Sequence, residues 1–177
     1  MKKLLLLLVT VSMLGVFGCK EEEETVVTPT AKDPIVGTWL SEGANLAPGF
    51  YAFKYKKISA TFNENKSYTV VATDSANTNY TFTGTYSATA SAYTDTVSGS
   101  NTKGSVIYNI VLTQSTPNAV TSNGIYAVTS TALRYEVIQT TPALTDFGAP
   151  TAQKGFGSTT YKTFPLGATW IQKYVKQ

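Results

Sequence analysis

The segment YTFTGTYSA, residues 80–88, carries the periodicity that decides the fold. Its even positions hold aromatic or small residues, and its odd positions hold threonine or serine. Successive side chains of a β-strand point to opposite faces, so this alternation places an apolar stripe on one face only. The segment therefore predicts a strand with one face on a core and the other face toward solvent.

The same two-residue period recurs later in the chain. The residues that share one face are Val106, Tyr108, Ile110 and Leu112 in one segment, and Leu133, Tyr135 and Val137 in another. In the first segment Ile107 and Val111 make the opposite face partly apolar too, which predicts that both faces are covered there. No segment shows a convincing amphipathic helix, so the chain is predicted to be all-β.

One predicted strand changes phase. Its apolar residues fall first on odd and then on even positions: Tyr51, Phe53 and Tyr55, followed by Ile58, Ala60 and Phe62. A β-bulge near Lys56-Lys57 would keep both groups facing inward. A bulge of this kind bends a long strand, as the corners of a small closed barrel require.

Short polar segments separate the strands and predict hairpins. Residues 63–67, the dipeptide Asn123-Gly124 and residues 129–131 are the predicted turns. Consecutive strands with short links form an antiparallel meander, here of about eight to ten strands. Residues 168–176 form a last strand that could pair with the first and close the sheet. Residues 141–160 are irregular, and we expect them either to fold across an opening as a lid or to cover a sheet edge.

Composition removes several classes of function. The chain has no histidine, and Cys19 is its single cysteine, so His-dependent catalysis, thiolate catalysis and Cys/His metal sites are not expected. The acidic residues are scattered without a pairing motif, and Asp74, Asn77 and Asn79 read as a polar turn rather than a calcium loop. The net charge of +3 is too small for a nucleic-acid partner. We therefore predict no enzyme activity, no cofactor and no metal.

The first 18 residues have the features of a signal peptide. Lys2 and Lys3 precede an uncharged stretch, residues 4–18, that is shorter than the roughly 20 apolar residues of a membrane-spanning helix. The following segment VFGC, residues 16–19, resembles the bacterial lipobox. This resemblance implies cleavage before Cys19 and lipidation of that cysteine; the alternative is a free or disulfide-bonded cysteine. The predicted organisation is a signal peptide (1–18), a lipidated charged tether (19–33) and one domain (34–177).

The tether predicts where the protein resides. Two or more acyl chains hold a protein stably on a membrane. The run KEEEE, residues 20–24, resembles the charged tether of surface-exposed lipoproteins in some Gram-negative lineages, and its like charges repel and keep it extended. The resemblance implies attachment to the outer membrane, facing the cell surface, with the periplasmic face as the alternative.

The domain begins with IVGTWL, residues 35–40, which resembles the Gly-x-Trp signature of lipocalin-like proteins. The hairpin ISATFNENKSYTVVA, residues 58–72, is similar to a hairpin of small bacterial lipocalin-like lipoproteins, although Asn65-Lys66 replaces the usual glycine-containing turn. The resemblance implies an antiparallel up-and-down barrel that Trp39 plugs at one end, with Arg134 stacked on Trp39. A β-sandwich with Trp39 in its core remains the alternative.

A barrel of this size can hold one small ligand. We predict a pocket for an apolar or amphipathic molecule, lined by inward aromatic residues: Tyr51, Phe53, Tyr55, Tyr68, Tyr80, Phe82, Tyr86, Tyr108 and Tyr135. The same residues could instead simply fill the barrel. In that case the protein would act as a structural or interaction lipoprotein, whose outer faces meet a protein or glycan partner.

Overall fold

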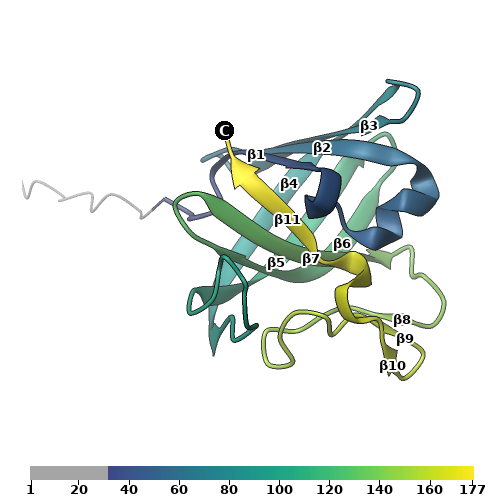
Figure 1. The fold of residues 1–177 in the computed structure, drawn as a ribbon. Coiled ribbons are helices and arrows are strands. Elements are labelled where there is room, and N and C mark those ends of the chain that lie inside the picture. The colour runs from purple at the N-terminus through teal and green to yellow at the C-terminus, as the bar shows by residue number, and fades with distance from the viewer. Residues whose placement is uncertain (1–31) are drawn as a thin grey trace, which may run out of the picture. The chain divides into compact units, whose positions relative to one another are not determined.

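The computed structural model describes residues 32–177. Within them, eight strands form a closed antiparallel barrel (Figure 1). The barrel strands are β1 (Gly37–Glu42), β2 (Tyr55–Phe62), β3 (Ser67–Asp74), β4 (Asn79–Thr94), β5 (Val106–Thr116), β6 (Val120–Val128), β7 (Ala132–Thr141) and β11 (Gln172–Lys176). The predicted all-β, up-and-down barrel is confirmed, and the sandwich alternative is wrong. The predicted signal peptide, Cys19 and nearly all of the tether lie outside the described residues.

The smaller elements lie in the connections. Three short strands form a separate sheet: β8 (Phe147–Gly148), β9 (Thr160–Tyr161) and β10 (Phe164–Pro165). Three 3-10 helices are η1 (Gly43–Asn45), η2 (Pro48–Phe53) and η3 (Gly167–Trp170). The first two helices lie between β1 and β2, and η3 leads into β11. The predicted last strand therefore exists, although it begins at Gln172 rather than at residue 168.

Strand β1 closes the barrel by pairing with both β2 and β11. On the β11 side Trp39 lies opposite Lys176 and Leu40 opposite Val175. The backbone N–H of Gln177 extends this seam by donating to the Thr38 carbonyl at 2.9 Å. Because the barrel is closed, neither β1 nor β11 is a free sheet edge. A free edge could pair with strands of other chains.

A buried glutamine holds the other end of the seam. The Gln172 side chain donates to Ser41 Oγ at 2.7 Å and accepts from the Ala47 backbone N–H at 2.7 Å. Gln172 is 2% exposed, so both hydrogen bonds are shielded from water. One side chain thus fastens β11 to β1 and to the segment that leads into η2.

One end of the barrel is packed solid. Its fully or almost fully buried side chains are Ile35, Trp39, Phe62, Tyr86, Tyr126 and Leu133. The Trp39 indole N–H donates to the Ile35 carbonyl at 2.7 Å, and the Phe62 and Tyr86 rings meet edge to face at 5.3 Å. Burial of one such ring stabilises the fold by about 2–3 kcal/mol.

The predicted bulge is confirmed, but the strand before it is not. The β2–β3 register shifts between Tyr55 and Lys57. Tyr51 and Phe53 belong to η2 and not to a strand. Pro48 favours the first turn of a helix because its φ is already fixed, and Gly49 lies under the Trp170 ring, where an added Cβ would come within 2.6 Å. These two constraints override the alternation in the sequence.

The predicted turn at Asn123-Gly124 is wrong. Both residues lie in the middle of β6, where Gly124 pairs with Ile110 on one side and Val137 on the other. A Cβ at Gly124 would lie 2.1 Å from the Glu136 carbonyl oxygen. The glycine therefore permits close approach of two strands, and the turn lies at residues 117–119 instead. The predicted turns at 63–67 and 129–131 are confirmed.

The irregular segment 141–160 covers an outer face of the barrel. Ala152 is buried against Ile107, Ile125 and Ala127, and Phe156 packs on the same cluster. The predicted coverage of this face is confirmed at Ile107 but is wrong at Val111, which is 38% exposed. The segment lies mainly over the outer faces of β5 and β6, and its residue Leu144 also lines the interior cavity. It does not cover a sheet edge, because the barrel is closed.

A buried carboxylate attaches this segment to β7. Glu136 is fully buried, and it accepts hydrogen bonds from the backbone N–H groups of Gly157 at 2.6 Å and Thr159 at 2.9 Å. The Thr159 hydroxyl donates a third at 2.6 Å. Hydrogen bonds to a buried charged group are among the stronger polar contributions to a fold.

The substitution Glu136→Gln should loosen this attachment. The amide would turn an N–H₂ group toward backbone N–H donors and should lower the free energy of unfolding by about 2–3 kcal/mol. Trypsin should then cut after Lys154 faster than in the parent, which limited proteolysis with mass analysis measures. Glu42→Gln, at an exposed carboxylate, is the control. Unchanged cleavage in Glu136→Gln would contradict the role given to Glu136.

Candidate functional site

A cavity of about 400 Å³ occupies the barrel end away from Trp39. Its wall consists mostly of aliphatic side chains, together with one phenylalanine: Ile58, Val70, Ala72, Phe82, Leu112, Val137 and Ile138. They come from β2, β3, β4, β5 and β7, so the cavity lies inside the barrel. Its volume falls within the range of about 300–1,000 Å³ that is usual for small-molecule sites.

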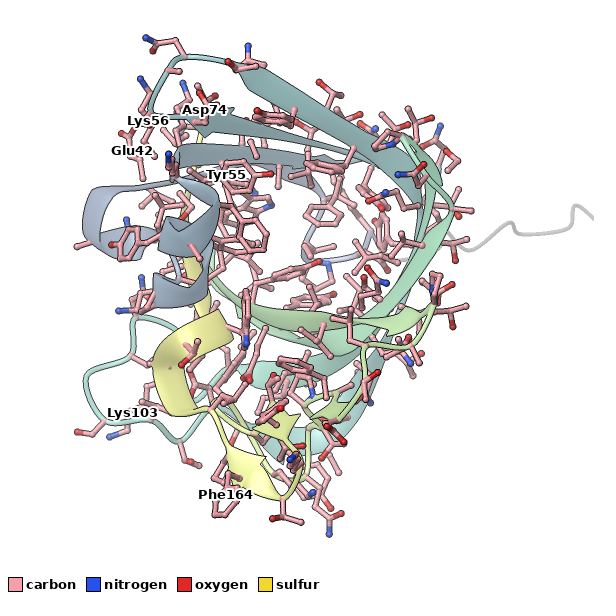
Figure 2. The ribbon with its side chains drawn as sticks, turned by 90° about the vertical axis from the view of Figure 1, so that its right-hand side faces the viewer. Glu42, Tyr55, Lys56, Asp74, Lys103 and Phe164 are labelled. Carbon is pink, nitrogen blue, oxygen red and sulfur yellow. The ribbon has the colours of Figure 1, made fainter. Side chains whose placement is uncertain are left out.

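Aromatic rings surround the mouth of the cavity. Phe50 of η2 meets Trp170 of η3 edge to face at 5.7 Å, and Phe53 stacks on Tyr55 at 5.9 Å. Figure 2 shows Tyr55 beside the helix that precedes it. Phe53 is 57% exposed, so the cavity meets solvent at this rim. The two 3-10 helices thus place the rings that frame the opening.

Three tyrosines form the base of the cavity. Tyr68, Tyr135 and Tyr174 line it, and Tyr135 meets Tyr174 edge to face at 6.2 Å. Burial raises the pKa of all three hydroxyls above the usual value of a tyrosine. Each hydroxyl therefore stays protonated at neutral pH and can donate or accept a hydrogen bond. Ser122 and Gln139 add two further polar side chains.

Five of the nine residues predicted for the pocket line this cavity. They are Phe53, Tyr55, Tyr68, Phe82 and Tyr135. Tyr51 is 56% exposed on η2, and Tyr80 is 44% exposed, although its ring lies 5.8 Å from that of Tyr55. Neither of them reaches the cavity.

The other two predicted residues fill the packed end of the barrel. Tyr108 stacks on Tyr126 with ring centres 4.9 Å apart, and Tyr86 packs on Phe62. The alternative that these rings are core is therefore the correct one for Tyr86 and Tyr108. The alternation identified inward residues, but it did not tell at which height along the barrel they lie.

The sequence did not identify several residues of the cavity. Phe50 and Trp170 belong to 3-10 helices that no periodicity indicated, and Ser122 lies in a strand obscured by the supposed turn at Asn123-Gly124. The alternation could have identified Tyr174, because Gln172 and Tyr174 share the buried face of β11 and exposed Lys173 lies between them.

The predicted stacking of Arg134 on Trp39 is wrong. Arg134 lies on the outer side of β7, with its guanidinium carbon 4.8 Å from the centre of the Phe156 ring. Lys176 takes the expected position instead, because its ammonium lies 5.2 Å from the Trp39 ring. Lys176 is the residue directly opposite Trp39 across the seam, so the cross-strand register brings this cation to the indole.

The segment around Asp74 forms a polar turn, as predicted. Asp74 Oδ1 accepts hydrogen bonds from the backbone N–H groups of Ala76 and Thr78, each at 2.8 Å. Among residues 32–177 no group of three or more His, Cys, Asp or Glu side chains could hold a metal ion. The same part of the chain contains no helix long and apolar enough to cross a membrane.

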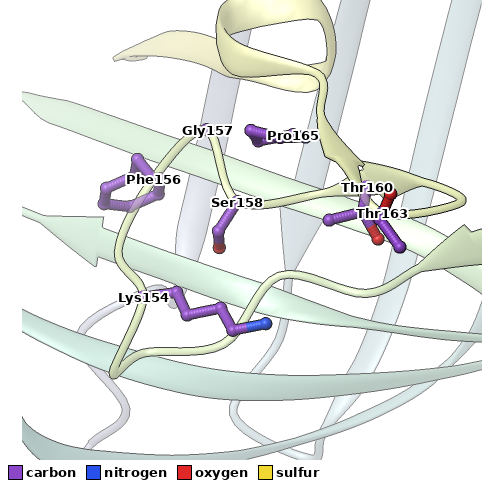
Figure 3. Close-up of a pocket in the computed structure, with 7 residues that line it drawn as sticks. All are labelled: Lys154, Phe156, Gly157, Ser158, Thr160, Thr163 and Pro165. Atoms are coloured by element: carbon purple, nitrogen blue, oxygen red, sulfur yellow. The ribbon is translucent and has the colours of Figure 1, made fainter.

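A second hollow, of about 360 Å³, lies in the outer segment. Its lining includes Lys154, Phe156, Ser158 and Thr160 (Figure 3). This lining mixes hydroxyl groups with one ring and belongs to the layer outside the barrel. It lacks the apolar wall of the interior cavity.

The site therefore defines a class: an antiparallel up-and-down barrel of eight strands with one packed end and one open, aromatic end. This architecture is consistent with a lipocalin-like fold. No family model matches the chain, and neither the curated proteins nor the solved structures contain a match.

The free energy of unfolding should fall at alkaline pH, because buried Tyr86 in the packed end then ionises. Burial, with a contribution from the nearby Asp33 carboxylate, raises the pKa of Tyr86 to about 12. Unfolded tyrosine ionises near pH ~10, so the contribution of neutral Tyr86 is complete below that pH and is lost as the pH rises through about 12. At about pH 11 the loss from this residue should be roughly 1 kcal/mol.

The substitution Tyr86→Phe removes one of several buried ionisable hydroxyls and should make this decline smaller by roughly 1 kcal/mol at about pH 11. Denaturant unfolding at about pH 9 and about pH 11 measures the change in the free energy of unfolding with pH. Tyr161→Phe, at an exposed ring, should leave the decline as in the parent. An equal decline in the parent and in Tyr86→Phe would show that Tyr86 does not contribute.

Proposed function

We propose that this protein is a membrane-anchored, lipocalin-like lipoprotein whose barrel binds one small apolar or amphipathic ligand. The single observation that carries the proposal is the cavity of about 400 Å³ inside the barrel. A barrel whose function was purely structural could be filled throughout, as the end around Trp39 is. Here the inward-facing positions leave this space at the end away from Trp39.

The lining favours an apolar body with a polar group. None of the described residues that line the cavity carries a charged side chain, so burial of a charged ligand there would be costly. Burial of apolar ligand surface would contribute roughly 25 cal/mol for each Å² removed from water. The hydroxyls of Tyr68, Tyr135 and Tyr174 could orient one polar group of the ligand.

The anchor gives the proposed site its location. Residues 16–19 resemble a lipobox, and we propose that lipidated Cys19 and the acidic tether hold the barrel on the outer membrane. Exposure at the cell surface is the proposed orientation, with the periplasmic face as the alternative. No enzyme activity forms part of the proposal, because the chain offers no histidine and no paired acids.

A second candidate function is an interaction lipoprotein that binds a protein or glycan. The observation that favours it is Phe164, which is 70% exposed on the β9–β10 hairpin and points away from the barrel in Figure 2. Tyr161, 42% exposed, is its partner across the hairpin. Exposed rings of this kind are frequent in interfaces. The two functions differ in whether the interior or the hairpin makes the contact.

Native mass spectrometry tests the first function directly. The full chain, purified from its own membrane in mild detergent, should carry a co-purifying molecule of apolar or amphipathic character. Extraction with organic solvent should release it and allow its chemical class to be identified. A uniform mass without any bound molecule, and no uptake of added lipids, would contradict the proposed binding function.

The substitution Val70→Trp should block the cavity. Val70 lines the wall, and an indole there would occupy most of the space that a ligand needs. Val71→Trp is the matched control, because its side chain points to the opposite face of the same strand. An uncharged naphthylamine dye, which fluoresces in apolar surroundings, should bind the parent and Val71→Trp but bind Val70→Trp at least about tenfold more weakly.

Circular dichroism and thermal unfolding must first show that both variants fold. Equal dye binding by the two folded variants would place the dye outside the barrel and would contradict the cavity as the ligand site. Loss of binding in Val71→Trp alone would do the same.

A further inference from the structure

Two cations face each other on the outside of the barrel. Arg134 of β7 and Lys173 of β11 are direct cross-strand partners. Their neighbours Leu133 and Tyr174 are buried in the core, so the two cations point to the outer face. Like charges directly opposite each other on one face destabilise a sheet. An anion between or beside them would remove this repulsion.

One N–H donor of the buried Arg134 side chain has no hydrogen-bond partner among the described residues. The residue is 8% exposed, and its Nε atom is buried with no partner within the described part of the chain. Its closest acid is Asp95, whose Oδ2 lies 3.7 Å from Nη1, too far for a hydrogen bond. A guanidinium has five N–H donors, and a buried donor without an acceptor costs free energy.

The neighbouring carboxylates are already engaged elsewhere. Asp95 accepts hydrogen bonds from the Val97 backbone N–H and from the hydroxyls of Ser100 and Thr102, at 3.0, 2.7 and 2.6 Å. Glu136 accepts its three hydrogen bonds from the outer segment. The acids thus have their donors, whereas Arg134 Nε has no acceptor among the described residues. Asp95 is a negative partner of Arg134 only through an ion pair of 3.7 Å, which is too long for a hydrogen bond.

A hollow of about 300 Å³ lies at this point. Arg134 and Lys173 form one side of it, and the β4–β5 loop forms the other with Val97, Ser98, Gly99, Ser100 and Asn101. The loop residues on this side include two serines and an asparagine, and the Ser100 hydroxyl already donates to Asp95. We propose that this hollow is a binding site for an oxyanion group: a carboxylate, sulfate or phosphate.

The Arg134 guanidinium packs against an aromatic ring. Its carbon lies 4.8 Å from the centre of the Phe156 ring, so the ring supports the planar fork. A fixed fork matches the two oxygens of an oxyanion and forms paired, charge-assisted hydrogen bonds. Lys173 supplies a second positive charge at the solvent side. The site is separate from the interior cavity, and it does not depend on the proposed ligand-binding function.

Titration with inorganic phosphate, sulfate and acetate tests the site. Chloride keeps the ionic strength constant, so that general screening does not change. The full chain in a non-ionic detergent should show saturable shifts of the amide resonances of Gly99, Ser100 and Asn101. The relative affinities of the three anions indicate which oxyanion class the site prefers. Absence of saturable shifts with all three anions would overturn the proposal.

Matched variants separate the site from general surface charge. Lys173→Gln removes one cation from the hollow and should weaken binding of the preferred anion about fivefold. Lys103→Gln removes the same charge from the same β4–β5 loop, outside the hollow, and should change the affinity less than about twofold (Figure 2). Equal losses in the two variants would overturn the proposal, because they would show attraction by net charge alone.

Arg134→Lys examines the fork itself. It keeps the positive charge beside Asp95, which protects the fold, but removes the paired donors. Binding should weaken at least as much as in Lys173→Gln, and thermal unfolding verifies that the variant is folded. Parental affinity in folded Arg134→Lys would overturn the assignment of Arg134 as the central contact.

Discussion

The pairing of β1 with β11 is the constraint on which the rest of the structure depends. These two strands come from opposite ends of the described chain, and their contact turns a meander of strands into a barrel. The seam is short, but it is reinforced at both ends. Lys176 lies over the Trp39 ring at one end, and buried Gln172 binds Ser41 and the Ala47 backbone at the other. Without closure, the inward face would have no common interior.

The two ends of that interior differ because the residues that face it differ in size. Around Trp39 the inward residues are large rings, such as Phe62, Tyr86 and Tyr126, and they exclude a cavity. Toward the 3-10 helices they include Val70, Ala72 and Ser122, which leave about 400 Å³ unfilled. The same strands thus form both the packed end of the barrel and the cavity. The packed end contributes more to stability, because the side chains around the cavity lack packing contacts on one side.

The alternation of apolar residues predicted the antiparallel meander, its approximate strand number and the bulge near Lys56, while the resemblance at residues 35–40 implied the barrel. Five of the nine residues proposed for the pocket line the cavity. The alternation failed where backbone geometry decides the outcome. Gly124 reads as a turn residue, yet it lies in a strand, and the space there requires a glycine because the Glu136 carbonyl leaves no room for a Cβ. Tyr51 and Phe53 read as a strand, yet Pro48 and the Trp170 ring favour a 3-10 helix there. Arg134 was assigned to Trp39, but cross-strand register places Lys176 on that ring.

Closure of the barrel can be measured through nuclear Overhauser contacts across the β1–β11 seam. In the full chain, labelled with ¹⁵N and ¹³C, a closed barrel should give backbone contacts between Leu40 and Val175 and between Trp39 and Lys176, together with side-chain contacts from Lys176 to the Trp39 ring. Contacts of β1 to β2 alone, with none to β11, would mean an open sheet. That result would contradict the closed barrel and, with it, the interior cavity.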